Sequence, residues 1–322
     1  MDTFAGKRAV VTGGGSGMGR ALVVQLAAEG CAVATCDVNP IGLAETLARA
    51  QQSAPEGATL TTHICDVSDE QQVLAFRDQV VEAHGPVIEL LFNNAGVGGG
   101  GSFVADDRKD WERTFGVDWW GVYYCTRAFL PNLVAAEEAR VVNTSSVNGF
   151  WASIGPGIPH TAYSTSKFAV KGFSESLIED FRVNAPHVGV SVVMPGHIGT
   201  DIGANSRRYF GRPEPDALTE SDLDETRTML NKRGVPTEDM TADQLRGIVK
   251  LIEEGFRDAA PLDPAGAARI ILDGVRAGRW RILVGDDAVR LDEQVRANPE
   301  AAYDHENIGI TPLSFGGAGS QA

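Results

Sequence analysis

Short apolar runs alternate with amphipathic stretches from residue 8 to residue 194. Runs of the kind that form buried strands lie at 8–12, 32–36, 59–65, 87–92, 140–144 and 188–194. Stretches with helical spacing of apolar residues separate them, at 17–29, 41–52, 69–84, 110–135 and 161–183. The long stretch 110–135 is a candidate for a kink. This alternation predicts an α/β fold built from βαβ units, with a doubly wound parallel sheet covered by helices on both faces.

The alternation breaks off over residues 199–264, which are polar and charged with scattered proline and glycine. A structureless loop of this length is unusual inside a compact domain, so we expect an insertion of short helices. The pattern then resumes, with a helix over 264–277, a strand over 281–284 and a polar helix over 286–302. One domain over 1–322 that contains this insertion explains the pattern better than two domains do.

Composition and charge argue against several partners. The chain has 28 Lys and Arg against 43 Asp and Glu, a net charge of −15. Nucleic acid and anionic membranes are polyanions, so neither is expected to bind. With no run of about 18 apolar residues and no signal-peptide pattern, we expect no membrane span and a cytoplasmic location. The Gly- and Ser-rich end, 313–322, predicts a flexible tail.

The cysteines and histidines show no metal-ligand spacing, so we expect no metal site. Three of the four cysteines lie in or beside predicted strands, which favours reduced, buried thiols. The four are Cys31, Cys36, Cys65 and Cys125.

A glycine-rich turn joins the first predicted strand to the first predicted helix. Residues 12–19 read TGGGSGMG, with the spacing G-x-x-x-G-x-G through Gly13, Gly17 and Gly19, and with Ser16 and Met18 between them. Glycines let the backbone approach a pyrophosphate, and N–H groups at a helix start bind phosphate without a basic side chain. We therefore favour a dinucleotide site over a plain glycine-rich turn.

Asp37 follows the second predicted strand. A carboxylate there can accept hydrogen bonds from both ribose hydroxyls of an adenosine and would repel a 2′-phosphate. The neighbouring Val38 is not basic, nor is Ser16, so the prediction is NAD rather than NADP. The alternative role for Asp37 is a helix N-cap, for which Asn39 competes.

Two further groups of residues follow the third and fourth predicted strands. Asp66 and Val67 come after the third strand, although Asp66 could simply cap the next helix. Asn94, Ala95 and Gly96 end an Asn-Asn-Ala-Gly run after the fourth strand. Ligands bind at the carboxyl ends of strands in open α/β sheets, so both groups are candidates for cofactor contact.

Tyr163 and Lys167 are four residues apart on a predicted helix and therefore share one face. A cation one turn away, together with the positive charge of an oxidised nicotinamide, would favour the tyrosinate and lower the tyrosine pKa. Tyr163 would then serve as an acid or base near neutrality. By itself the spacing occurs often by chance, and the alternative is a surface pair.

Around this pair the chain resembles the short-chain dehydrogenase/reductase family. The shared motifs occur in the family's order: TGGGSGMG, Asp66-Val67, Asn93-Asn94-Ala95-Gly96, Val141-Val142-Asn143-Thr144-Ser145-Ser146, Tyr163-Ser164-Thr165-Ser166-Lys167 and Pro195-Gly196-His197-Ile198-Gly199-Thr200. The resemblance implies a Rossmann-type fold, a nicotinamide cofactor and hydride transfer at an alcohol or carbonyl carbon.

The resemblance also implies a role for each matching residue. Ser146 would hydrogen-bond the substrate oxygen, Tyr163 would pass the proton, and Lys167 would bind the nicotinamide ribose and lower the pKa of Tyr163. Ser146 is preferred to Ser145 because it directly precedes a Val-x-Gly stretch. The residues that would hold the nicotinamide are Pro195, Gly196, Ile198 and Thr200. The family's members usually form dimers or tetramers, so a homodimer or homotetramer is expected.

The chain departs from the family pattern in two places. Asp118 stands where the family has a catalytic Asn; an ionised Asp only accepts hydrogen bonds, and it could hold a water or pair with Lys167. It could also be tolerated with little effect. Ser146 and Tyr163 are 17 residues apart, about four more than is common in the family, and the extra residues fall within 150–159. We interpret them as a longer apolar loop over the substrate.

The insertion 199–264 occupies the family's substrate-lid position and carries Tyr209, Phe210, Met229 and Leu230. With Phe150 and Trp151 of the longer loop, these side chains favour a bulky, apolar secondary alcohol or ketone as substrate. The alternative is that they only pack the lid against the domain. A second hypothesis for the whole protein is a cofactor-binding regulatory or turnover-deficient member of the same fold, which Asp118 alone favours.

Overall fold

The computed structural model describes residues 1–155, 158–232 and 235–304. Its strands are β1 (Arg8–Thr12), β2 (Ala32–Asp37), β3 (Leu60–Ile64), β4 (Leu90–Asn93), β5 (Ala139–Thr144), β6 (Val188–Pro195) and β7 (Arg281–Val284). Its helices are α1 (Gly17–Ala28), α2 (Pro40–Ser53), α3 (Glu70–His84), α4 (Arg108–Phe115), α5 (Gly121–Val134), α6 (Thr161–Asn184), α7 (Ile202–Tyr209), α8 (Glu220–Lys232), α9 (Ala242–Asp258), α10 (Pro264–Arg276) and α11 (Asp286–Ala297).

The seven strands form one parallel sheet in the order β3-β2-β1-β4-β5-β6-β7. The chain winds outward from β1 to β3, returns to place β4 beside β1, and then winds outward in the other direction. The strand order therefore reverses between β1 and β4, the place where ligands bind in folds of this kind. This is the predicted α/β fold, a Rossmann-type doubly wound sheet.

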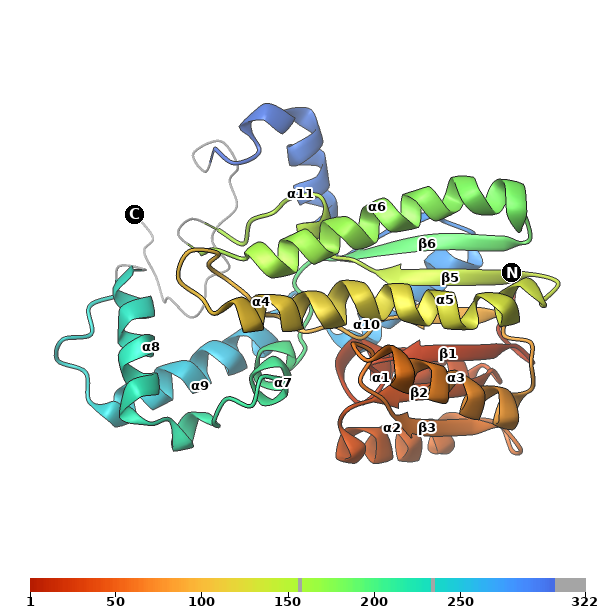
Figure 1. Ribbon diagram of the computed structural model, residues 1–322, viewed down its shortest axis with the longest axis horizontal. Coiled ribbons are helices and arrows are strands. Elements are labelled where there is room, and N and C mark those ends of the chain that lie inside the picture. Colours follow the sequence, from red (N-terminus) through yellow and green to blue (C-terminus); the bar gives the residue numbers. More distant parts are fainter. Residues whose placement is uncertain (156–157, 233–234, 305–322) are drawn as a thin grey trace.

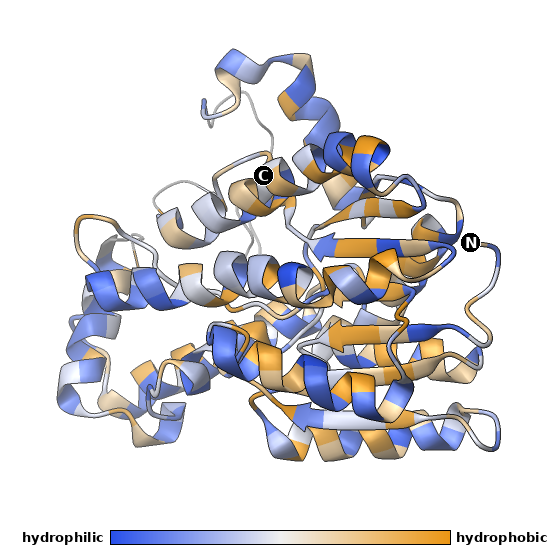
Figure 2. Cartoon of the chain, turned by 45° about the vertical axis from the view of Figure 1, so that its right-hand side comes forward, coloured by the Kyte–Doolittle hydropathy of each residue, from blue (hydrophilic) through white to orange (hydrophobic). Residues whose placement is uncertain are grey.

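Helices cover both faces of the sheet, as Figure 1 shows. One core lies between the sheet and α3, α5 and α6, and includes Phe76, Phe129 and Phe181. The other lies between the sheet and α1, α2 and α10, and includes Leu22 and Ile271. The inner strands β1, β4 and β6 are mostly apolar, as expected when both faces of a parallel sheet are covered, and Figure 2 shows much of the sheet in orange. The edge strand β3 is more polar and only partly buried. All four cysteines are buried and free, as predicted.

The insertion after β6 forms α7, α8 and α9, which lie to one side of the sheet in Figure 1. A small core of its own holds α8 and α9 together, built from Leu218, Leu223, Leu230 and Leu245. The expectation of short helices is wrong for α9, which has 17 residues. A capping box at Thr241 and Gln244 starts this helix.

The long helical stretch before β5 is interrupted, as the candidate kink suggested. A π-helical turn, Gly116–Trp120, joins α4 to α5 and has Asp118 at its centre. Such turns inside helices are rare and often lie at functional sites. Gly121 follows the turn, and a Cβ there would lie 2.6 Å from the Val67 side chain, so the start of α5 packs directly against the segment that follows β3.

The predicted elements agree with the observed ones to within about three residues at each end, except that the predicted helix 286–302 ends earlier, with α11 at Ala297. No helix in the ranges described is both long and apolar enough to cross a membrane. The predicted flexible tail, 313–322, lies outside the described residues.

Candidate active site

The glycine-rich turn after β1 is closely packed against its neighbours. Gly13 has a φ of +69°, and a Cβ there would lie 2.7 Å from the Ala95 Cα. A Cβ on Gly19 would lie 2.1 Å from the Gly13 carbonyl oxygen. Glycine is therefore required at both positions: a side chain at Gly13 would meet the segment after β4, and one at Gly19 would separate α1 from the turn. Gly17, with a φ of +52°, opens α1.

Asp37 ends β2 beside this turn. Its carboxylate accepts hydrogen bonds from the Gly15 N–H at 2.9 Å and from the Asn39 N–H at 3.0 Å. The N-cap of α2 is Asn39, which accepts from the Gly42 N–H. The alternative role of Asp37 as that cap is therefore wrong.

Asp66 likewise does not cap the helix that follows it, because Asp69 caps α3. The Asp66 carboxylate accepts from the Ser68 hydroxyl at 2.7 Å and from the Tyr209 hydroxyl of the lid at 3.2 Å. Asp66, which follows β3, is thus hydrogen-bonded to Tyr209 of the lid.

The amides of Asn93 and Asn94 link neighbouring strand ends. Asn93 donates to Asn143 of β5, and Asn94 donates to the carbonyl oxygens of Thr12 and Gly13. The Asn94 Oδ1 is buried and has no hydrogen-bond partner in the part of the chain that the structure describes. It is therefore an acceptor available to a bound group.

These residues line a cavity of about 400 Å³ at the carboxyl ends of β1, β2, β3 and β4. The predicted cofactor residues that line it are Gly13, Ser16, Gly17, Met18, Gly19, Asp37, Asp66, Val67, Asn94, Ala95, Gly96 and Thr200. The close-packed glycine turn, the free Asn94 acceptor and the carboxylate of Asp37 fit a dinucleotide. The residues present therefore suit the cofactor that the sequence predicts.

Three predicted nicotinamide residues do not line this cavity. Pro195 ends β6. Ile198 is buried in the core between the sheet and α1, α2 and α10, and its backbone forms an isolated β-bridge with Leu262. Gly196 packs against the start of α11: a Cβ there would lie 2.3 Å from a carboxylate oxygen of Asp287. Asp287 in turn accepts the His197 N–H at 2.7 Å. Sequence reasoning missed Asp287, and no local signal marks it.

The two adjacent serines after β5 have different surroundings. The Ser145 hydroxyl donates to the Lys167 carbonyl oxygen at 2.8 Å, so it is occupied in holding α6 to the sheet. Ser146 begins the 3₁₀ turn Val147–Gly149, where its hydroxyl accepts the Asn148 N–H, and it also hydrogen-bonds Tyr163. This places Ser146, rather than Ser145, beside the tyrosine.

Tyr163 and Lys167 lie on one face of α6, with the Lys167 Nζ 5.3 Å from the centre of the tyrosine ring. Burial raises the pKa of the Tyr163 hydroxyl; Lys167 and the hydrogen bond with Ser146 lower it, and the charge of Asp118 raises it further. The net direction is upward. Lys167 thus lowers the Tyr163 pKa as expected, but burial of the hydroxyl outweighs it. The sequence argument did not include this loss of hydration around Tyr163.

Asp118 lies directly beside Lys167. Its Oδ1 is 3.7 Å from the Lys167 Nζ and accepts the Val97 N–H at 2.9 Å. Both side chains are buried, at 0% exposure for Asp118 and 3% for Lys167, whose ammonium also donates to the Thr144 carbonyl oxygen. Burial raises the pKa of Asp118 to about 6 although Lys167 lowers it. Of the alternatives for Asp118, the structure shows the pair with Lys167.

The catalytic candidates adjoin the cavity through Gly96. A Cβ on Gly96 would lie 3.0 Å from the Asp118 Oδ1 and 3.3 Å from the Lys167 Nζ. Gly96 itself lines the cavity, so the buried ion pair lies directly behind the cavity wall. His160 packs on the Tyr163 ring, with the ring centres 4.6 Å apart, and burial lowers its pKa to about 4, so it is neutral near pH 7.

Most apolar side chains that suggested a bulky substrate pack elsewhere. Leu230 belongs to the core of the lid and Met229 packs against it. Trp151 is buried beside Ala302 and donates to its carbonyl oxygen, with Phe150 beside it. For these four residues, the alternative of simple packing is the one that the structure supports.

The lid instead supplies cofactor-cleft residues that sequence reasoning missed. Besides Thr200, the cavity is lined by Ile202, Asn205, Arg208 and Tyr209, all on α7. The helical spacing of 205, 208 and 209 places them on one face, but nothing in the sequence shows what that face contacts.

Comparison with known proteins gives consistent results. A model of the short chain dehydrogenase family matches residues 7–209. A Mycobacterium tuberculosis protein named "Putative oxidoreductase SadH" is 34% identical over 296 residues, which are 92% of each chain. The structure is similar to that of a short-chain dehydrogenase/reductase from Burkholderia phymatum in complex with NAD (TM-score 0.73, 31% identity, 93% of this chain and 96% of that one). It is also similar to a metagenomic short-chain oxidoreductase in complex with NADP (TM-score 0.52, 30% identity, 60% and 83%).

Proposed function

The chain belongs to the short-chain dehydrogenase/reductase family, and we propose that it is an NAD-dependent enzyme that interconverts a secondary alcohol and a ketone. The observation that carries the proposal is the convergence of Ser146, Tyr163 and Lys167 behind a cavity suited to a dinucleotide. Tyr163 and Lys167 are also candidates for cofactor contact, but binding a cofactor alone does not require the serine. The presence of Ser146 beside Tyr163 therefore favours catalysis over a cofactor-binding regulatory or turnover-deficient protein.

In the proposed reaction the chain holds the substrate oxygen and moves one proton. A bound nicotinamide supplies or accepts the hydride. The Ser146 hydroxyl hydrogen-bonds the substrate oxygen, and Tyr163 gives a proton to that oxygen in reduction or takes it in oxidation. Lys167 lies beside Asp118, and its charge lowers the free energy of the tyrosinate.

The preference for NAD rests on Asp37. Its carboxylate lies in the wall of the cavity at the end of β2, where it can accept hydrogen bonds from the adenosine ribose and would repel a 2′-phosphate. Val38 and Ser16 provide no cation to offset that repulsion. Relatives of similar identity bind NAD in one solved structure and NADP in another, so a direct competition between the two cofactors is the appropriate test.

The proposed substrate is a small-molecule alcohol or ketone. Because Phe150, Trp151, Met229 and Leu230 are used in packing, the proposal no longer rests on them for a bulky, apolar group. Phe210 remains close to the glycine segment after β4: a Cβ on Gly99 would lie 2.7 Å from its ring. A panel that spans small and bulky secondary alcohols therefore decides this point.

We also propose that two or four copies of the chain associate through α5 and α6. Trp120, Tyr123 and Phe168 expose 42%, 36% and 40% of their surfaces, and Trp120 and Tyr123 pack edge to face beside each other. Exposed aromatic groups of this kind are enriched at protein interfaces. Sedimentation of the wild-type protein and of Trp120→Glu measures the number of copies in each assembly, and the variant is expected to weaken association. A monomeric wild-type protein contradicts the proposal.

The function is tested by following nicotinamide absorbance with NAD and the alcohol panel, with Tyr163→Phe as the matched variant. Loss of about 10²-fold or more in turnover, with NADH binding unchanged, is expected when a general acid or base is removed. Turnover that survives in Tyr163→Phe contradicts the assigned role. NADH binding without any turnover by the wild-type protein would instead support the turnover-deficient alternative.

A further inference from the structure

We propose that Arg208 of α7 binds the pyrophosphate of the dinucleotide, and that Glu214 is the partner that Arg208 gives up when the cofactor binds. The inference rests on the proposed nucleotide site. Arg208 would be a cofactor-binding residue on the lid, outside the sheet and the glycine-rich turn.

The first observation is the charge of the cavity wall. Among the described residues that line the cavity, Arg208 is the one with a positive charge, and Asp37 and Asp66 are negative. A pyrophosphate carries two negative charges. The N–H groups at the start of α1 offset part of that charge, and a guanidinium matches the geometry of phosphate oxygens.

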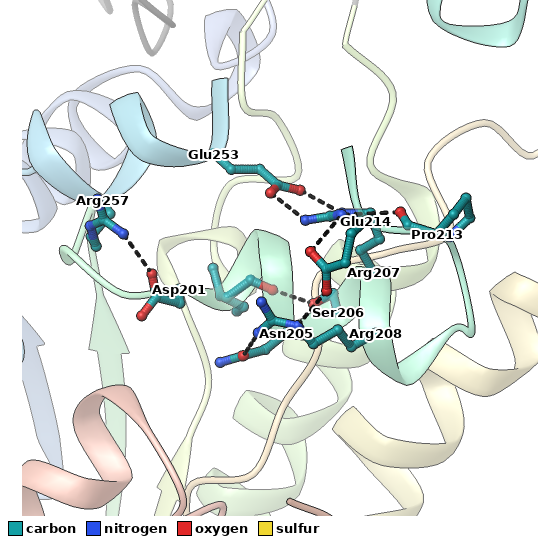
Figure 3. Close-up of polar contacts among 10 residues, drawn as sticks. Asp201, Asn205, Ser206, Arg207, Arg208, Pro213, Glu214, Glu253 and Arg257 are labelled. Carbon is teal, nitrogen blue, oxygen red and sulfur yellow. Dashed lines mark hydrogen bonds and ion pairs between the residues drawn. The ribbon is translucent and has the colours of Figure 1, made fainter. Parts of the chain in front are cut away.

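The second observation is a chain of contacts that leads from Arg208 to the phosphate-binding turn. The Arg208 guanidinium donates to the Asn205 Oδ1 at 3.2 Å, and the Asn205 amide donates to the Ser16 hydroxyl at 3.0 Å. Figure 3 shows Asn205 beside Arg208 on α7. Arg208 is therefore one side chain away from the turn that is expected to hold the phosphates.

The third observation is that α7 is held in place without Arg208. Arg207 forms two hydrogen bonds with the carboxylate of Glu253 on α9, and Arg257 pairs with Asp201 just before α7 (Figure 3). Ser206 accepts the Gly98 N–H from the segment after β4. Arg208 contributes to none of these bonds, so its role is not needed to anchor the helix.

The present partner of Arg208 is an exposed one. Its Nε donates to the Glu214 Oε1 at 2.7 Å, and both side chains are about half exposed, at 55% and 51%. An ion pair this exposed contributes little to stability, because water screens both charges. A phosphate in the cavity therefore competes readily with Glu214 for the guanidinium.

The test measures affinities rather than turnover, by NADH fluorescence and by displacement of NADH with ADP, adenosine and adenosine 2′,5′-bisphosphate. Arg208→Gln is expected to raise the Kd for NADH and for ADP about tenfold or more, the loss of a hydrogen bond to a charged group. The Kd for adenosine is expected to stay unchanged. Arg208→Lys is expected to recover part of the affinity, because it restores the charge without the fork.

Two further variants separate phosphate binding from a structural role. Glu214→Gln frees Arg208, while Arg207, which also donates to Glu214, keeps its two hydrogen bonds to Glu253. This variant is expected to bind NADH as tightly as the wild type or more tightly. Arg212→Gln removes the same charge from the same lid, but Arg212 pairs with Asp110 and does not line the cavity. It is expected to leave every Kd unchanged.

Several outcomes overturn the inference. Equal weakening by Arg208→Gln and Glu214→Gln, extending to adenosine, would show that their ion pair only supports the lid. Weakening confined to adenosine 2′,5′-bisphosphate would assign Arg208 to a 2′-phosphate instead. Normal binding of NADH and ADP by Arg208→Gln refutes the inference and leaves the proposed function intact, whereas a wild-type protein that binds neither refutes both.

Discussion

Replacing Asp118 by asparagine removes one buried charge and leaves the shape of the side chain almost unchanged. Asp118 is 0% exposed, and burial raises its pKa from 3.8 to about 6 even with Lys167 beside it. The shift of about 2 pKa units corresponds to about 3 kcal/mol, because one unit is about 1.4 kcal/mol. Keeping this carboxylate ionised in the folded chain therefore lowers the free energy of unfolding by about 3 kcal/mol at neutral pH.

The dependence on pH follows from the same shift. Below the unfolded pKa of 3.8 the carboxyl is protonated in both states and costs nothing. As the pH rises toward 6, the unfolded chain releases this proton before the folded chain does, so stability falls. Above about pH 6 the whole cost is present. Asparagine keeps an acceptor for the Val97 N–H but titrates nowhere in this range, so it avoids the cost.

Thermal unfolding of the two proteins between pH 4.5 and pH 8 measures the effect. At pH 7 the Asp118→Asn variant is expected to melt about 4 °C higher, since about 3 kcal/mol is spread over the unfolding entropy of a chain this long. The difference is expected to shrink to about 1 kcal/mol at pH 4.5. Asp224→Asn, at an exposed position of α8, serves as the control and should show no such pH dependence. A variant less stable than wild type at pH 7 would refute the reasoning, because the carboxylate would then be a net stabilising partner of Lys167.

Three other predictions follow from the site. The rising limb of the pH profile for alcohol oxidation should move to lower pH in Asp118→Asn, because the charge that raises the pKa of Tyr163 is gone. Ser166→Ala is the uncharged control, and a move to higher pH contradicts the assignment. Asp37→Ser should lower the kcat/KM ratio of NAD over NADP by about tenfold or more; an unchanged ratio would place the ribose elsewhere. Gly196→Ala should lower the free energy of unfolding by about 1–3 kcal/mol through its clash with Asp287, a cost that should shrink in an Asp287→Ala background if the clash is its cause.

The α/β frame could be predicted because its signals are local. Each strand is a short apolar run, and Asp37 and Asn94 stand at strand ends, so the topology alone brings them to one edge of the sheet. The interruption of the long helical stretch could also be predicted from nearby residues, but its π-helical geometry could not. Nothing in the residues around Asp118 distinguishes a π-helical turn from a bend in an α-helix.

The remaining features depend on contacts between distant segments. Asn205 contacts Ser16 across 189 positions of sequence, and Asp287 meets the His197 N–H across 90. Helical spacing can assign residues to one face of α7, but it cannot say whether that face meets the substrate, the cofactor cleft or solvent. For the same reason Leu230 was assigned to a substrate wall although it lies in the core of the lid.

The stability cost of Asp118 bears on the proton transfer of the proposed reaction. Asparagine would accept the same Val97 hydrogen bond without a buried charge, so the scaffold alone gives no reason for a carboxylate here. The carboxylate does act on Tyr163, whose pKa it raises together with burial. A higher tyrosine pKa keeps Tyr163 protonated near neutral pH, and the protonated form is the one that donates a proton to a carbonyl oxygen. We therefore expect ketone reduction to persist to a higher pH in the wild-type protein than in Asp118→Asn, since the variant lacks the charge that raises the pKa of Tyr163. A reduction profile that does not move in Asp118→Asn would separate Asp118 from the proton transfer.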